Sequence, residues 1–194
     1  MATIAIVGGG FCGIEVARHL KGHDVTLFDR KDYFEYTPST HKMLANNSYE
    51  KKIHIPYSKF KVKLVKEEVK SITANSVVTE NDSYGFDYLV LCSGSSTEKP
   101  AHENVYTLKN GEDAKAISKA LESAEEVTIV GGGFTGVEIA GELATKTKKR
   151  VRLLNGSARL MDRANKEVGE RAADFLHKNG VQILFNKKVD HAGE

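Results

Sequence analysis

The chain has 194 residues, and its content of 40% hydrophobic and 28% charged residues is typical of a globular protein rather than of a disordered one. The 28 Lys and Arg residues against 26 Asp and Glu residues give a formal net charge of +2, which excludes the strongly basic surface of a nucleic-acid-binding protein. The longest apolar stretches have the length of strands, so no transmembrane segment is predicted. The apolar start at residues 2–7 lacks the basic segment of a signal peptide, and we expect a cytoplasmic protein.

Two nearly identical ten-residue blocks organise the chain. Residues 6–15 read IVGGGFCGIE and residues 129–138 read IVGGGFTGVE, with differences at two positions. Each block is a G-x-G-x-x-G pattern between a short apolar strand and a segment with helical spacing of apolar residues, which is typical of a dinucleotide site at a helix N-terminus. The cofactor-binding residues expected in the two loops are Gly8, Gly10, Phe11, Cys12 and Gly13 in the first and Gly131, Gly133, Phe134, Thr135 and Gly136 in the second.

The remaining segments follow the same alternation of strands and helices. Apolar and β-branched runs predict strands at 3–7, 24–28, 61–65, 69–72, 76–79, 87–91, 127–130, 150–154 and 181–185. The 87–91 run is predicted to be a buried parallel strand, and residues 112–122 an amphipathic helix. The expected fold is α/β, with two Rossmann-like units built on parallel sheets, over residues 1–108 and 109–194. Both units are expected to be incomplete at their C-terminal side.

The residue at the end of the second strand indicates which nucleotide each loop takes. Asp29 lies 21 positions beyond Gly8, where an acid accepts hydrogen bonds from the adenosine ribose. The corresponding residue of the second unit is Asn155, 24 positions beyond Gly131. A neutral amide does not repel a 2′-phosphate, and Arg159 would add positive charge, which slightly favours NADPH; hydrogen bonding of Asn155 to the ribose of NADH is the open alternative.

The spacing of the two cysteines excludes two kinds of site. Cys12 lies in the first glycine loop and Cys92 at the end of the 87–91 strand, so they form neither a C-x-x-C pair nor a metal-ligand pattern. The sequence therefore predicts no redox dithiol and no metal site, with Cys92 as a small buried apolar side chain.

These motifs resemble the flavoproteins with two dinucleotide domains, the pyridine nucleotide-disulfide oxidoreductase superfamily. Within it, the chain is most similar to type II NADH dehydrogenases and to the apoptosis-inducing-factor-like branch that includes ferroptosis suppressor protein. The resemblance covers nearly the whole chain, and the segments that carry it are IVGGGFCGIEVARHL, VTLFDRKDYF, EEVKSIT, FDYLVLCSGS, IVGGGFTGVEIAGELA and KNGVQILFNKKV.

The resemblance implies a role for several residues. The first loop and Asp29 would hold FAD, Val69 would offer its backbone to the adenine, and Ser93 with Gly94 would close over the cofactor. Lys42 falls where relatives place a basic residue near the flavin, and an exposed helix lysine is the equally good alternative. His41 is expected to be an exposed helix histidine.

The activity that the resemblance implies is hydride transfer from NAD(P)H to FAD, with electrons passed to an acceptor that is commonly a quinone. The flavin carries this chemistry, so no catalytic side chain is expected. The alternative is a non-catalytic nucleotide-binding or interaction module, or an inactive fragment of such an enzyme.

Relatives continue beyond the point that corresponds to Glu194. The sequence therefore predicts an incomplete protein that self-associates or is completed by a second chain, with peripheral membrane contact reserved for the absent part.

Overall fold

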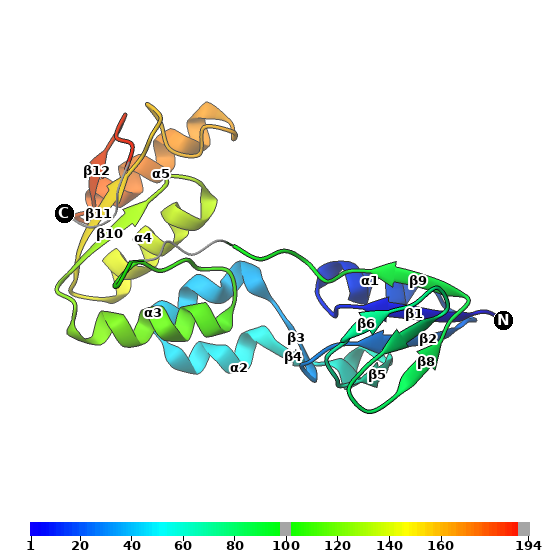
Figure 1. The fold of residues 1–194 in the computed structure, drawn as a ribbon. Helices are drawn as coiled ribbons and strands as arrows, with labels where there is room; N and C mark the ends of the chain where they lie inside the picture. The colour runs from blue at the N-terminus through cyan, green and yellow to red at the C-terminus, as the bar shows by residue number, and fades with distance from the viewer. Residues whose placement is uncertain (98–101, 190–194) are drawn as a thin grey trace. The chain divides into compact units, whose positions relative to one another are not determined.

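The computed structural model describes residues 1–97 and 102–189, which fall into two compact units (Figure 1). The first unit comprises Met1–Tyr36 with Lys51–Ser96, and the second Thr37–Glu50 with Thr97–Glu194. In this division residues 37–50 and the residues from 97 on group with the second unit, and the assignment of FAD and NAD(P) domains to residues 1–108 and 109–194 stays a prediction.

A four-stranded parallel sheet forms the centre of the first unit. Its strands are β1 (Thr3–Val7), β2 (Asp24–Phe28), β5 (Lys63–Val65) and β9 (Tyr88–Leu91), in the order β5-β2-β1-β9. Helix α1 (Phe11–His19) connects β1 to β2. The parallel register brings the carboxyl ends of β1, β2 and β9 together at one edge, beside the first glycine loop.

The two faces of this sheet have separate cores, because successive side chains of a strand point to opposite faces. Ile4, Ile6 and Leu27 pack in one cluster with Ile14 of α1. The opposite cluster consists of buried residues from β1, β2 and β7: Ala5, Phe28 and Val77.

Short elements connect β2 to β5 and β5 to β9 along the chain. Strands β3 (Tyr33–Glu35) and β4 (His54–Pro56) pair antiparallel, and β6 (Ser71–Ile72), β7 (Ser76–Val78) and β8 (Ser83–Gly85) form an antiparallel meander. The other short elements are η1 (Thr37–Leu44), η2 (Asn47–Tyr49), α2 (Glu50–Ile53) and η3 (Tyr57–Phe60).

The second unit repeats the strand–loop–helix arrangement of the first. Its parallel sheet has the order β10 (Glu126–Val130), β11 (Arg150–Leu154), β12 (Gln182–Leu184). Its helices are α3 (Gly111–Ser123), α4 (Phe134–Lys146) and α5 (Lys166–Lys178). The α/β class and the parallel sheets of both units are as predicted.

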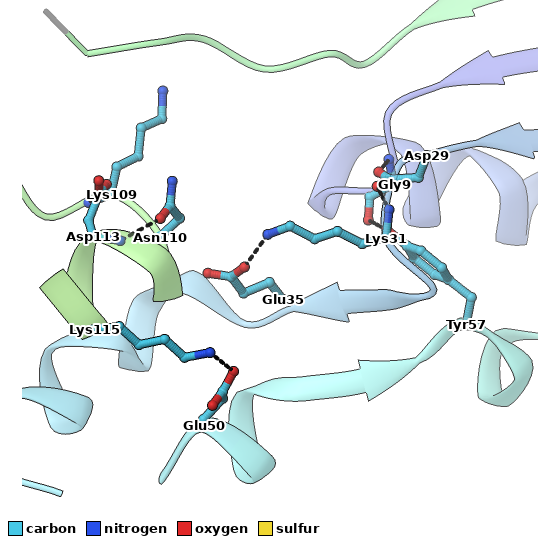
Figure 2. A network of polar contacts seen from close by, with 10 residues as sticks. All are labelled: Gly9, Asp29, Lys31, Glu35, Glu50, Tyr57, Lys109, Asn110, Asp113 and Lys115. Atoms are coloured by element: carbon cyan, nitrogen blue, oxygen red, sulfur yellow. Dashed lines mark hydrogen bonds and ion pairs between the residues drawn. The ribbon is translucent and has the colours of Figure 1, made fainter. Parts of the chain in front are cut away.

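Segment η1 joins the second unit because its apolar face packs on α3 and α4. Met43 and Leu44 of η1 are buried, at 0% and 4% exposure. An ion pair of 2.6 Å between Lys115 Nζ of α3 and Glu50 Oε1 fastens the end of residues 37–50 to α3 (Figure 2). Asn110 is the N-cap of α3, and its side chain accepts a hydrogen bond of 2.9 Å from the Asp113 backbone N–H (Figure 2).

One prediction about the first sheet is wrong. Strand β9 pairs parallel with β1 as expected, but Tyr88 is 65% exposed and Leu91 is 61% exposed. The apolar run in the sequence is typical of a strand covered on both sides. Among the described residues β9 lies at the edge of its sheet, with β1 as its neighbour.

Candidate dinucleotide sites

The first glycine loop follows β1 directly and is fixed by close backbone contacts. Gly8 has φ +101°, and its N–H donates to the Phe28 carbonyl oxygen at 2.9 Å. A Cβ atom on Gly8 would lie 2.2 Å from the Cys92 carbonyl oxygen, and one on Gly13 would lie 1.9 Å from the Gly8 carbonyl oxygen. Both positions therefore require glycine.

Gly10 differs from these two glycines because it faces open space. It is the N-cap of α1, with φ −72° and ψ −166°, and a Cβ atom there would meet nothing within 4 Å. The first backbone N–H groups of α1 have no acceptor within the helix. They also form the positive end of the helix dipole. An anionic group such as a pyrophosphate fits this place.

Two side chains form hydrogen bonds with Gly9 of the first loop (Figure 2). Asp29 Oδ2 accepts from the Gly9 N–H at 2.6 Å and Asp29 Oδ1 from the Lys31 N–H at 2.8 Å, while the Tyr57 hydroxyl donates to the Gly9 carbonyl oxygen at 2.9 Å. Tyr57 is 2% exposed, and burial, followed by the nearby Asp29 carboxylate, raises the pKa of its hydroxyl. Asp29 thus lies beside the loop where the sequence placed it. No sequence pattern indicated Tyr57.

The second glycine loop has the same backbone geometry. Gly131 has φ +104°, and its N–H donates to the Leu154 carbonyl oxygen at 2.8 Å. A Cβ atom on Gly136 would lie 1.9 Å from the Gly131 carbonyl oxygen, whereas one on Gly133, the N-cap of α4, would meet nothing within 4 Å. The second loop therefore offers the same open helix N-terminus as the first.

Asn155 occupies in the second unit the place of Asp29 in the first. Its Oδ1 accepts from the Gly132 N–H at 3.1 Å, and its Nδ2 donates to Ser157 and to the Arg159 carbonyl oxygen at 2.9–3.1 Å. The side chain is only 6% exposed. The Arg159 guanidinium donates to the carbonyl oxygens of Ala164 and Asp162. A direct contact of Asn155 with a ribose remains a prediction, and the contacts seen here give it a role in shaping the loop.

The other predicted residues lie at different distances from these loops. Ser93 and Gly94 follow β9, where the Cys92 N–H donates to the Val7 carbonyl oxygen at 2.7 Å, and thus lie at the edge that holds Gly8. Phe11 and Phe134 head the two helices and are 50% and 56% exposed. Val69 packs on the core cluster of Ala5, Phe28 and Val77.

In the second unit, a cavity of about 290 Å³ lies beside the second loop. His41 and Lys109 line it together with Thr135 and Glu138 of α4. His41 Nδ1 and Glu138 Oε2 are 3.5 Å apart, and the His41 side chain is 14% exposed, so the expectation of an exposed histidine is wrong. Burial of η1 against α3 and α4 explains the difference.

Lys42 follows His41 in the sequence, but its side chain points to the ring of Tyr49. Its Nζ donates to the Tyr49 hydroxyl at 3.4 Å and lies 5.3 Å from the centre of that ring. Lys42 is half-buried and belongs to the second unit, so its place near a flavin remains a prediction.

The two cysteines, 80 positions apart, meet in the structure. The Sγ atoms of Cys12 and Cys92 are 2.9 Å apart, although their spacing in the sequence predicted no dithiol. Cys12 is exposed and Cys92 is partly buried. Burial, followed by the hydrogen bond with Cys12, raises the pKa of Cys92 to about 11.

The comparison with protein families decides the relationship. The family model described as pyridine nucleotide-disulphide oxidoreductase matches residues 2–194. The chain belongs to this family. FAD and NAD(P)H are the cofactors of its members.

Individual relatives agree with this assignment. Ferroptosis suppressor protein 1 of Xenopus tropicalis is 28% identical over 96% of this chain and 52% of the relative. Among solved structures, NDH2 of Plasmodium falciparum in complex with NADH has a TM-score of 0.81 at 19% identity over 95% of this chain and 48% of that one. The sulfide:quinone oxidoreductase of Aquifex aeolicus has a TM-score of 0.76 at 20% identity over 96% and 51%. These structural similarities concern the fold, and the chain spans about half the length of the curated relative.

The residues present fit the family's cofactors. Each loop combines an open position at the middle glycine of the pattern, Gly10 or Gly133, with the N-terminus of a helix of nine or more residues. No group of three His, Cys, Asp or Glu residues suited to a metal ion exists among the described residues, and no helix in that part of the chain is long and apolar enough to cross a membrane.

Proposed function

We propose that the protein is an FAD-dependent oxidoreductase that transfers a hydride from NAD(P)H to bound FAD and passes the electrons to a quinone. The observation that carries this proposal is the doubling of one loop geometry. Gly8 and Gly131 share φ values of +101° and +104°, and Gly10 and Gly133 share an open extended N-cap. Two equivalent nucleotide sites in one chain are what an enzyme needs to bring a nicotinamide and a flavin into one reaction.

We assign FAD to the first loop and NAD(P)H to the second. The N–H groups at the start of α1 and α4 would hold the two pyrophosphates. Each Asp29 oxygen accepts one hydrogen bond from the protein and keeps a further lone pair for a ribose hydroxyl. The backbone of Val69 and the segment Ser93–Gly94 complete the proposed FAD site.

Bound FAD supplies the redox chemistry, so the role of the chain is to bind and orient. The cavity beside Thr135 is the place that we assign to the nicotinamide end of NAD(P)H. His41 and Glu138 line this cavity, and their separation of 3.5 Å lets a protonated His41 pair with the carboxylate. We propose that this pair orients the carboxamide of the nicotinamide.

For the second nucleotide, we propose that both NADPH and NADH are accepted. Asn155 is neutral, so it does not repel a 2′-phosphate, and its amide is already engaged by the loop. Arg159 follows on the same segment and provides positive charge beside the strand end.

The quinone as acceptor is supported by the fold that the chain shares with a sulfide:quinone oxidoreductase. The same fold serves other acceptors, so the acceptor is tested separately from the hydride transfer.

The test uses the purified chain loaded with FAD and dialysed. We expect bound flavin absorbance, bleaching of that absorbance by NADH or NADPH without oxygen, and recovery of colour when a short-chain ubiquinone is added. Bleaching without recovery of colour would support hydride transfer to FAD and contradict the quinone as electron acceptor. A chain that binds no flavin would contradict the proposal and favour a nucleotide-binding module.

Two matched variants assign the sites. Gly10→Val should remove FAD and Gly133→Val should remove bleaching while FAD stays bound, each with a loss of affinity of roughly 100-fold, or about 2.7 kcal/mol. Neither new Cβ atom meets a protein atom within 4 Å, so both variants should fold. The opposite pattern of losses would reverse the assignment.

A further inference from the structure

The strongest unassigned feature is the contact between Cys12 and Cys92. Cys12 stands in the first turn of α1, within the glycine loop, and Cys92 immediately follows β9. Their sulfur atoms are 2.9 Å apart, whereas the sulfurs of a disulfide are about 2.05 Å apart. A movement of less than about one ångström would therefore bring the two atoms to bonding distance.

The backbone around the two cysteines holds them in this position. The Cys92 N–H donates to the Val7 carbonyl oxygen at 2.7 Å, which ties Cys92 to the end of β1. The Cys92 carbonyl oxygen lies so close to Gly8 that a Cβ atom there would be 2.2 Å away. The glycine loop and the end of β9 are thus packed together before any bond forms.

We propose that Cys12 and Cys92 are a reversible oxidation site, whose disulfide fastens the first glycine loop to β9. Hydrogen peroxide is the oxidant, and a small thiol such as glutathione is the reductant. The proposal concerns this pair of residues and does not depend on the electron acceptor of the protein.

The chemistry assigns a different role to each cysteine. Cys12 is exposed, so its sulfur attacks the peroxide, the O–O bond breaks, one water leaves and a sulfenic acid forms. The Cys92 sulfur then attacks the Cys12 sulfur and displaces the second water as the S–S bond forms. In total, two thiols lose two protons and two electrons, and one peroxide becomes two waters. Cys92 is partly buried and its sulfur already lies 2.9 Å from the Cys12 sulfur, so it is placed for the second step; its proton leaves as the S–S bond forms and ends in the second water.

The position of the bond determines its consequence. It would join residues 80 positions apart, and cross-links that close long loops restrict the unfolded chain most strongly. Because the sulfurs move little, the loop should keep the shape that the structure shows. We therefore expect oxidation to stabilise the empty first unit while its FAD site stays usable. Bound FAD would cover Cys12 and slow the oxidation, which is the one part that rests on the proposed function.

The test treats the full chain with hydrogen peroxide and maps its peptides without reduction. We expect one linked pair of peptides containing Cys12 and Cys92 in the monomer, reversal by glutathione, and a higher melting temperature for the oxidised protein. The variants Cys12→Ser and Cys92→Ser should each lose the cross-link and the shift in melting temperature. Cys12→Ser should also resist oxidation at Cys92, whereas Cys92→Ser should accumulate oxidised Cys12.

Several outcomes would overturn the proposal. These are oxidation of Cys12 to sulfinic acid in the unmodified chain without a cross-link, disulfides only between two chains, or a cross-linked protein that melts at a lower temperature. Preincubation with FAD separates the two hypotheses. A cross-link that forms at the same rate with and without FAD would leave the oxidation site in place and count against the FAD assignment.

Discussion

The two glycine loops share one backbone conformation, but different side chains form hydrogen bonds with them. In the first loop, Gly9 is held between the Asp29 carboxylate and the Tyr57 hydroxyl. In the second, Gly132 is held by the Asn155 amide and lies against Leu160. The glycine pattern thus determines the path of the chain, and residues distant in sequence determine the charge beneath it. The side chains that hold each loop can therefore be mutated separately.

The largest difference is expected for alanine at the first glycine of each loop. Gly8→Ala and Gly131→Ala both place a side chain at φ above +100°, but the new Cβ atom clashes with the Cys92 carbonyl oxygen in the first loop and meets nothing in the second. We expect Gly131→Ala to cost about 1–2 kcal/mol and Gly8→Ala clearly more. Hydrogen–deuterium exchange would show strong loss of protection in β1 and α1 for Gly8→Ala, and a smaller loss in β10 and α4 for Gly131→Ala. Equal losses would mean that the close contact at Cys92 is unimportant.

A smaller difference is expected when the charges of Asp29 and Asn155 are exchanged. Asn155→Asp replaces a donor with a carboxylate that faces the carbonyl oxygens of Ser157 and Arg159, in a site that is 6% exposed. We expect a loss of about 3 kcal/mol in the free energy of unfolding, and only about 1 kcal/mol for Asp29→Asn, which keeps one of its two accepted hydrogen bonds.

Urea denaturation at several pH values measures this exchange. The loss in Asn155→Asp should shrink at low pH, because the protonated carboxyl group donates a hydrogen bond again. A greater loss in Asp29→Asn than in Asn155→Asp would contradict the view that Asn155 is the more tightly enclosed side chain.

The smallest effect concerns the hydroxyl that only the first loop has. Tyr57→Phe removes the hydrogen bond to Gly9 and should cost about 1 kcal/mol near neutral pH. Because the pKa of Tyr57 is raised in the folded state, the unfolded tyrosine ionises first, and this residue's contribution to stability is lost as the pH rises above about 10. The variant should therefore lose stability less steeply in alkali.

The alkaline comparison needs a control, because the pKa of Cys92 is also raised, to about 11, and acts in the same direction. Cys92 is present in both proteins, and repeating the pair in a Cys92→Ser background isolates the tyrosine. Identical alkaline slopes with and without the hydroxyl would show that Tyr57 does not titrate with unfolding.

Local patterns in the sequence predicted the framework of both units well. The bounds of β1, β2 and β11 agree with the predicted ranges. Each strand is a short apolar run, and the residue that follows it is Gly8, Asp29 or Asn155. Helix α5, strand β8 and the exposure of β9 were missed. For β9, burial depends on which strand lies beside it, and an isolated apolar run contains no information about its neighbours.

The contacts that define the site were harder to predict, since they join distant segments. Tyr57 lies 48 positions from Gly9, and Cys12 lies 80 positions from Cys92. His41 was expected to be exposed, and its partner Glu138 lies too far along the sequence for a local pattern to indicate the contact. The roles of Asp29, Lys42, Val69 and Asn155 toward a bound cofactor stay predictions.

The interleaving of the two units has a practical consequence for anyone who wishes to study them apart. The chain crosses between the units three times, near residues 36, 50 and 96. A gene fragment that begins at residue 97 would omit η1 and leave uncovered the helix surfaces on which Met43 and Leu44 are buried. Such a fragment should precipitate on expression. A gene in which a flexible linker replaces residues 51–96, so that residues 37–50 are joined to the rest of the second unit, is the form that should stay in solution.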